Sequence, residues 1–404
     1  MTKVETGGKR RGQVSIFSLE ARIKRSLRDH LWRIGFTRNG DGELVPPQCT
    51  KEAIRQLHAA QRRAKLRENG AFIRAQWPKL KKYFADGQDV SPQDLTPELE
   101  LIAGGTWQSD LFRLASLTWS VPVSQGYGRR LRFLVWDRHN DRLIGLIALG
   151  DPVFNLKVRD EWVGWTVEDR RERLVGALDA YVLGAIPPYN QLLGGKLLAC
   201  LIRTQEVRAA FGAKYRQSTG IISKKKKSAE LCIVTTSSAL GRSSVYNRLA
   251  LGGRQYFESL GFTAGWGHFH IPDSLFAQMR QYLAEADDEY AGNHQYGDGP
   301  NWRLRAIRKV LSRMNLNPDL MRHGITREVL ACQLADNAAK ALKDGNKATF
   351  RNLLSLEDVS ELARERWIVP RAERMPGYRA WSRDGIRDLL RHRAMASGRQ
   401  AANG

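Results

Sequence analysis

The segment 126–270 constrains the fold more than any other part of the chain, because it alternates strand and helix candidates with glycine turns. Arg130 to Trp136 and Arg142 to Leu149 are rich in aromatic and branched residues and flank a polar turn, which predicts a β-hairpin. Ala180 to Ile186 is short and apolar and ends at two prolines, as expected of a buried strand. Leu231 to Thr236 predicts another strand.

A glycine pair, Gly194 and Gly195, follows the strand at 180–186 and opens a helix expected over about 196–211. A strand, a glycine turn and a helix N-terminus can bind phosphate, because the backbone approaches the ligand and the amides point at the anion. Ordinary close packing explains the same pattern, so both interpretations stay open. Further along, we expect an extended segment at 162–165, a helix that includes Tyr256 and leads to Gly261, and a last strand at 265–271.

Helical patterns flank this segment. Apolar residues at helical spacing predict helices over about 18–34, 51–68 and 71–84, and further helices over 300–311 and 327–343. We therefore expect an α+β protein with three parts: a basic helical region over 1–95, a mixed-sheet domain with flanking helices over 96–275, and a basic helical region over 276–404.

The positive charge is concentrated at the two ends of the chain. The formal net charge is +23, of which residues 1–70 carry +9, residues 301–404 carry +10, and the long middle segment carries only +4. Basic surfaces attract nucleic acid through counterion release. We expect nucleic-acid contacts from four cations at 303–309, namely Arg303, Arg305, Arg308 and Lys309. A charge that only maintains solubility is the alternative.

Other function classes find little support in the sequence. The four cysteines form no C-x-x-C pair, so we expect neither a zinc ribbon nor a disulfide framework. His268 and His270 would share one face of a strand, but no third ligand is apparent and we expect no metal site. The sequence shows neither a signal peptide nor a membrane-spanning stretch, so we expect a cytoplasmic protein.

The order of hairpin, strand, glycine turn, helix and strand resembles the GCN5-related acetyltransferase fold. The cofactor loop of that family reads Q/R-x-x-G-x-G/A, and Gln191, Gly194 and Lys196 occupy its first, fourth and sixth positions. Lys196 departs from the small residue of the pattern, although Gly195 lies beside it. The resemblance implies that the amides of Leu193, Gly194, Gly195 and Lys196 hold the pyrophosphate of acetyl-CoA.

A second departure concerns the proton donor. Many of these enzymes end Tyr-x-x-x-Gly-Phe, where the tyrosine protonates the leaving thiolate, but here Phe257 begins the motif and has no ionisable hydroxyl. Tyr256 and Tyr246 are the candidate substitutes. The hydroxyl-rich stretch 235–244 contains Arg242 and Ser243, which fit either a phosphate-binding loop or a capped loop before a helix.

Longer blocks resemble the DruA family of the Druantia anti-phage system: GYGRR at 126–130, GLIALGDPVFNL at 145–156, PPYN at 187–190 and GRSSVYNRL at 241–249. The resemblance extends over about 101–367 and implies a role in bacterial defence with other defence proteins, but no established reaction. Two hypotheses follow. In the first, the central domain binds acyl-CoA or another phosphorylated ligand, with or without acyltransferase activity. In the second, the protein is a nucleic-acid-binding subunit without catalytic activity.

Overall fold

The computed structural model describes residues 11–391 except 41–43, 46–49, 125, 127, 220–225, 269 and 293–299. The chain divides into two compact units, each made of two stretches of sequence. The helical unit contains residues 1–61 and 264–326, and the sheet unit contains residues 62–263 and 327–404. Helix α2 (Lys51–Glu68) contains the first boundary between them. The three-part division at about 95 and 275 stays a prediction.

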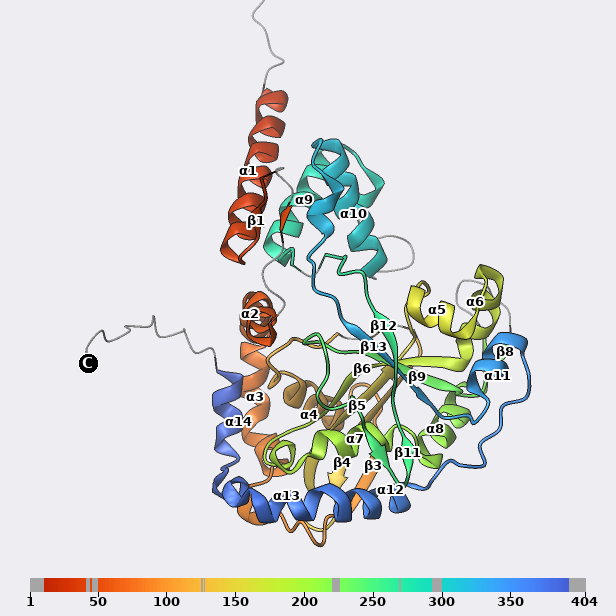
Figure 1. Ribbon diagram of the computed structural model, residues 1–404. Coiled ribbons are helices and arrows are strands. Elements are labelled where there is room, and N and C mark those ends of the chain that lie inside the picture. Colours follow the sequence, from red (N-terminus) through yellow and green to blue (C-terminus); the bar gives the residue numbers. More distant parts are fainter. Residues whose placement is uncertain are drawn as a thin grey trace, which may run out of the picture. The chain divides into compact units, whose positions relative to one another are not determined.

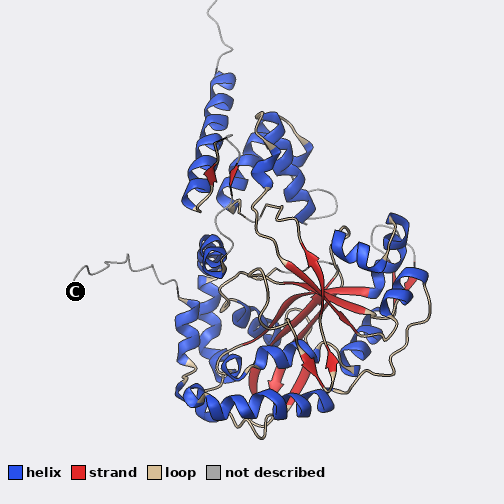
Figure 2. Cartoon of the chain, in the orientation of Figure 1, coloured by secondary structure: helices blue, strands red, loops and turns tan. Residues whose placement is uncertain are grey.

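The sheet unit is built on one seven-stranded mixed sheet with the order β12-β13-β9-β6-β5-β4-β3. Figure 2 draws the strands in red and the helices in blue. All neighbours are antiparallel except β6 and β9. The strands are β3 (Pro97–Leu101), β4 (Arg130–Asp137), β5 (Arg142–Gly150), β6 (Ala177–Ala185), β9 (Ile233–Ser237), β12 (Glu258–Phe262) and β13 (Glu328–Gln333). The expected hairpin at 130–149 and the strands at 180–186 and 231–236 are therefore confirmed.

Helices cover both faces of this sheet, and each face has its own apolar core. Alternate residues of β4 supply the two cores, with Phe133 and Val135 on one face and Leu134 and Trp136 on the other. Helices α7 (Gly194–Leu201), α8 (Gln205–Tyr215) and α12 (Leu356–Ala363) contribute to the first core. Helices α3 (Gly70–Leu80), α4 (Trp107–Ser116) and α14 (Asp384–Leu390) contribute to the second. The expected α+β class, a mixed sheet flanked by helices, is confirmed.

Shorter elements complete the sheet unit (Figure 1). They are α5 (Lys157–Val163), α6 (Val167–Arg173), the 3-10 turn η4 (Tyr189–Leu192), α11 (Ala338–Asp344), the π-helical turn η7 (Arg364–Ile368), α13 (Val369–Arg374), and the strand pairs β7 (Gln217–Thr219) with β8 (Lys226–Ser228) and β10 (Ala250–Leu251) with β11 (Arg254–Gln255).

The helical unit contains α1 (Arg11–Arg33), α9 (Asp273–Glu285), α10 (Pro300–Arg313) and the short pair β1 (Thr37–Arg38) and β2 (Leu44–Val45). The predicted apolar stripe of α1 is buried and packs on α9, as Leu19, Ile23, Leu27 and Leu31 show. In α9 and α10, Phe276 and Trp302 meet edge to face with ring centroids 5.4 Å apart.

Four local predictions are wrong. The segment around Gly261 is strand β12 rather than a helix end, because it pairs with β13 at the edge of the sheet. The start of the expected helix 327–343 is β13, a central strand buried on both faces, which therefore lacks a two-residue period. The expected strand 162–165 is the end of α5, which Gly164 terminates in the left-handed conformation. No strand occurs among the described residues of 265–271.

Candidate functional site

The candidate site lies at the edge of the sheet where β6 and β9 have their carboxyl ends. Among the described residues these strands form the only parallel pair, and they pair only from Ala177 to Asp179 of β6. Beyond Asp179, β6 continues beside β5 alone, with a register shift at Leu149. Since parallel strands end at the same edge, the glycine turn after β6 and the hydroxyl-rich loop after β9 both begin there. The sequence alone did not bring these two segments together.

The glycine turn has one packed glycine and one open glycine. A side chain at Gly194 would approach the carbonyl oxygen of Tyr189 to 2.7 Å, whereas a side chain at Gly195 would meet nothing within 4 Å. The amide of Leu193 donates to Tyr189, and the amide of Lys196 donates to Leu193 at 2.8 Å. Within the expected set of four amides, Gly194 and Gly195 therefore remain as candidate donors to a ligand, and only Gly195 offers an open approach.

Two cations lie beside this turn. The ammonium of Lys196 is 5.5 Å from the ring centroid of Trp367, and the Nε of Arg371 donates to the carbonyl oxygen of Gln191 at 3.1 Å. Arg371 comes from α13, 180 residues away in the chain, so no local motif could have identified it. Helix α12 packs on α7, and α13 follows it after η7 (Figure 1).

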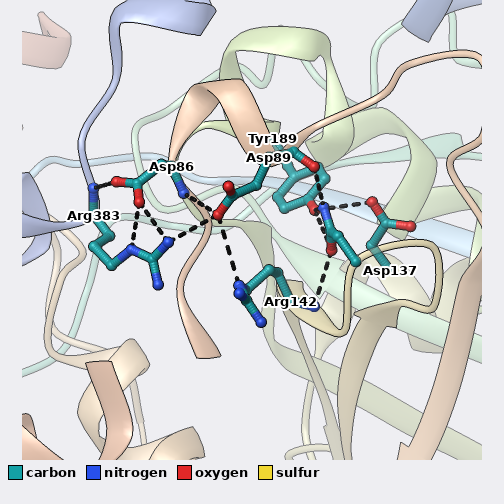
Figure 3. Close-up of polar contacts among 7 residues, drawn as sticks. Asp86, Asp89, Asp137, Arg142, Tyr189 and Arg383 are labelled. Carbon is teal, nitrogen blue, oxygen red and sulfur yellow. Dashed lines mark hydrogen bonds and ion pairs between the residues drawn. The ribbon is translucent and has the colours of Figure 1, made fainter. Parts of the chain in front are cut away.

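A buried polar network holds the turn in place (Figure 3). The hydroxyl of Tyr189 donates to Asp137 at 2.9 Å, and the side-chain amide of Asn140 donates to Tyr189 at 2.9 Å. Asp137 also accepts from the amide of Thr96 at 3.1 Å. Burial raises the pKa of Asp137 and, together with the charge of Asp137, the pKa of Tyr189. Tyr189 therefore stays a proton donor to Asp137 at neutral pH.

The same network reaches the C-terminal segment. Asn140 donates to the carbonyl oxygen of Asp89 at 2.8 Å, and the Asp89 carboxylate accepts from Arg383 at 2.9 Å. Arg383 also binds Asp86 through its Nε at 2.6 Å and its backbone amide at 2.7 Å. The turn after β6 and the segment before α14 are thus tied to one framework (Figure 3).

Asp179 lies where β6 and β9 separate, and sequence analysis missed it. Its carboxylate accepts from the Thr235 hydroxyl at 2.9 Å, and burial raises its pKa to about 6. Burial, together with the nearby charge of Asp179, also raises the pKa of Tyr246. Perturbed groups in one place are typical of functional sites, although structural networks also produce them.

The structure separates the two candidate tyrosines. Tyr246 belongs to the loop after β9 and packs on Phe257, with the rings tilted and their centroids 4.8 Å apart. Tyr256 is 2% exposed, and its ring centroid lies 5.8 Å from the guanidinium of Arg203, which follows α7. Burial raises the pKa of Tyr256. Tyr246 is therefore the tyrosine next to Asp179, whereas Tyr256 is part of the apolar core.

Hydrogen bonds to a buried carboxylate and within the loop itself hold the segment that contains Arg242 and Ser243. The backbone amide of Ser243 donates to the buried carboxylate of Glu328 at 3.3 Å, and its hydroxyl accepts from the amides of Val245 and Tyr246. These contacts favour a structural role for Ser243, because a carboxylate already faces its amide, but the expected helix after this loop is wrong: turns lead from it directly into β10. Arg242 is exposed, and its role in phosphate binding stays a prediction.

The four cations of α10 in the helical unit differ in their surroundings. Arg303 pairs with Asp273, donates to the carbonyl oxygen of Ile271 at 2.7 Å and packs over Phe276. Arg305, Arg308 and Lys309 are exposed, and Arg308 lies 5.1 Å from the ring centroid of Trp266. Three of the four predicted contacts are therefore accessible, and Arg303 is engaged within the unit.

A shallow cleft of about 340 Å³ contains Asn155, Asp160, Trp165 and Arg170 in its lining, but the Asp160 carboxylate already binds Arg159 and Arg170. In the described part of the chain, no group of three or more histidine, cysteine or acidic residues is arranged to hold a metal ion. No described helix combines the length and the apolar character that crossing a bilayer requires.

Fold and site together define a mixed α+β protein with a candidate anion site at the end of a strand. The family model described as Druantia protein DruA matches residues 48–344. The Druantia protein DruA of Escherichia coli (strain UMEA 4076-1) is 52% identical over 378 residues, which are 93% of this chain and 94% of that protein. The chain belongs to the DruA family. No solved structure matches the chain.

Membership confirms the expected family and identifies the chain as a Druantia anti-phage defence component. The resemblance to acetyltransferases and the predicted ligands stay predictions.

Proposed function

We propose that this defence component binds a phosphorylated ligand, such as an acyl-CoA, at the edge of the sheet where β6 and β9 end. One observation carries the proposal: at Gly195, the second residue of α7, an added side chain would meet nothing within 4 Å, and Lys196 and Arg371 lie beside the same turn. The first amides of a helix attract anions, and nearby cations add to that attraction. The sheet order also supports it, because ligands of open sheets bind where adjacent parallel strands separate.

A pair of substitutions at Gly195 tests the phosphate site. Asp at the start of a helix is favourable for folding but repels phosphate, whereas Asn has nearly the same shape without the charge. We expect acetyl-CoA or CoA to bind Gly195→Asp at least about tenfold more weakly than Gly195→Asn, measured by calorimetry at low salt. Gly212→Ala in α8 is the fold control, because its side chain would also meet nothing within 4 Å.

Two results would contradict the site. One is equal ligand affinity in the Asp and Asn variants, and the other is no binding of any CoA or nucleotide to the wild-type protein. Phage protection in cells at matched expression supplies a readout that does not require the ligand to be known.

Acyl transfer would be a further step, and we assign its proton donor to Tyr246. A tyrosine is protonated at neutral pH, as a general acid requires, while burial raises the pKa of Tyr246 and thus makes it a weaker acid than an exposed tyrosine. Tyr246→Phe should slow turnover of acetyl-CoA by about 10²–10⁴-fold while leaving CoA affinity intact. Tyr256→Phe is the matched control, since it also removes one buried hydroxyl. Equal turnover in both variants would disprove the assignment.

Nucleic-acid binding by the helical unit is the second candidate, favoured by the exposed side chains of Arg305, Arg308 and Lys309. Replacing all three with Ala should weaken DNA or RNA binding and reduce the slope of log affinity against log salt by about 2 to 3, because each phosphate contact contributes about 0.7–0.9. Arg303→Ala should change that slope little. A slope that depends on Arg303 and not on the other three would refute this assignment.

A further inference from the structure

One face of helix α1 in the helical unit is exposed and has no role in the functions proposed so far. Trp32 on this face is 78% exposed. Tryptophan is highly buried on average, and tryptophans at the surface are typical of binding sites, where the large ring contributes much of the affinity. The stability of the fold therefore does not explain why Trp32 lies in water.

The face around Trp32 is basic. Arg28 and Arg25 precede Trp32 by four and seven residues, which places the three side chains on one side of the helix. Between residues 21 and 35, the exposed positions carry five cations and a single carboxylate, that of Asp29. The cations are Arg22, Lys24, Arg25, Arg28 and Arg33. Such an imbalance of charge is complementary to a polyanion.

The arginines of this face are not used by other parts of the unit. Within the described part of the chain, no side-chain hydrogen bond or ion pair is made by these four residues: Arg22, Arg25, Arg28 and Arg33. Lys24 differs from them, because it pairs with Glu20 at 2.6 Å. An arginine without a partner in the protein keeps its forked set of donors for a ligand such as phosphate.

The opposite face of α1 anchors the helix and is not available to a partner. Its apolar stripe, which includes Ile23 and Leu27, is buried and packs on α9. The Nε2 of His30 also donates to the carbonyl oxygen of His270 at 2.7 Å. A helix that lies on a membrane inserts its apolar face. Because that face of α1 is already buried, the structure favours a charged ligand that meets the basic face.

Nucleic acid combines the two groups that this face can recognise. Arginine binds phosphate through paired hydrogen bonds, and a tryptophan ring stacks on the face of a base. In a duplex each base is covered by its neighbours, so an indole finds free base faces in a single strand. Arg22 and Arg33 are separated by about 16 Å along the helix axis, which is the length of several stacked nucleotides.

We propose that the exposed face of α1 binds a single-stranded nucleic acid, with Trp32 stacked on a base and with Arg25 and Arg28 at the flanking phosphates. The strand is DNA or RNA, since both present base faces and phosphates to this surface. The inference deepens the second candidate function and rests on it, because it names the kind of nucleic acid and adds α1 to the surface that binds it.

Fluorescence anisotropy with the full chain tests the stacking on Trp32. The probes are labelled oligothymidylate and oligouridylate of about 16 nucleotides and a DNA duplex of the same length. Trp32→Ala should weaken single-strand binding at least about fivefold and leave duplex binding and the salt dependence unchanged, because it removes a stacking ring and no charge. Trp32→Phe should retain most of the affinity. Trp107→Ala, at a tryptophan of the sheet unit that is 44% exposed, is the control.

The arginines supply a second readout. Replacing Arg25 and Arg28 together with Ala should reduce the slope of log affinity against log salt by about 1.4, since each phosphate of a single strand contributes about 0.7. Both side chains are exposed, so the helix should still fold. Arg55→Ala is the matched control, because Arg55 is an exposed arginine of the same unit that already pairs with Glu52 at 2.7 Å.

The outcomes separate this inference from the candidate function on which it rests. No binding of any probe by the wild-type protein would refute both. Full single-strand affinity in Trp32→Ala, or an equal loss for strand and duplex, would overturn the inference, even if the triple substitution in α10 still changes the salt slope. Binding to phosphatidylserine vesicles that Trp32→Ala abolishes, with strand binding intact, would assign the face to a membrane instead. A loss confined to the thymidylate or the uridylate probe would support the proposal and assign DNA or RNA.

Discussion

Replacing Asp179 with Asn should flatten the pH dependence of the stability of the sheet unit. Burial raises the pKa of this carboxyl from its ordinary value of 3.8 to about 6. Between these pH values the folded protein holds a proton that the unfolded chain releases. The contribution of Asp179 to the free energy of unfolding is therefore highest below about pH 4 and falls as the pH rises to about 6.

The expected magnitude follows from that shift. Two units of pKa correspond to about 3 kcal/mol at neutral pH, and partial exposure of the carboxylate reduces the expected cost to about 2 kcal/mol. The substitution leaves the local contacts largely in place. Asn can still accept from the Thr235 hydroxyl, now at 2.9 Å, and Arg159 keeps its ion pair with Asp160 at 2.6 Å.

Urea unfolding of both proteins from about pH 4 to about pH 7.5 measures the effect. Asp179→Asn should match the wild-type protein at the acidic end and become more stable by about 2 kcal/mol at the neutral end. Asp344→Asn, which changes an exposed carboxylate, is the control. A difference between Asp179→Asn and the wild-type protein that stays constant with pH would refute the raised pKa and remove Asp179 from the candidate site.

Three further predictions test the framework of the site. Gly194→Ala should destabilise the sheet unit by about 1–3 kcal/mol, because the added methyl group would crowd the carbonyl oxygen of Tyr189. Gly195→Ala should stabilise the unit by about 0.5–1 kcal/mol, because nothing lies near its side-chain position and alanine favours a helix more than glycine does. Melting temperatures that shift in the same direction in both variants would contradict this prediction. Tyr189→Phe should cost about 1–3 kcal/mol in urea unfolding, and no loss would show that Asp137 finds another donor. Arg303→Ala should lower the melting temperature of the helical unit, and an unchanged value would mean that its pairing with Asp273 contributes nothing.

Local sequence patterns were sufficient to predict those elements whose structure does not depend on a distant partner. The hairpin of β4 and β5 was predictable because its strands are rich in branched and aromatic residues and flank a polar turn. Helix α1 was predictable because its apolar residues repeat at helical spacing. The short segments β12 and β13 were not, since each is a strand only through pairing with the other, and β13 is buried on both faces.

The candidate site was predictable only in its glycine turn. The pattern at 191–196 indicated where a phosphate could bind, but it could not show that Gly194 is packed and Gly195 is open. Arg371 and Asp179 carry no local motif, and each matters through a neighbour far away in the chain. Sequence spacing cannot reveal such contacts without knowledge of which strands and helices pack together.

The phenylalanine at position 257 shows how the fold accommodates a departure from its expected pattern. Phe257 is 2% exposed and packs on Tyr246, so the ring at this position serves the core, and a hydroxyl reaches the end of β9 from the neighbouring loop instead. Tyr246 is there beside Asp179, whose raised pKa is a cost that apolar packing would not impose. Structural networks also perturb pKa values, so the pH dependence of Asp179→Asn, together with ligand binding to the same variant, separates a structural role of this carboxyl from a role in the proposed site.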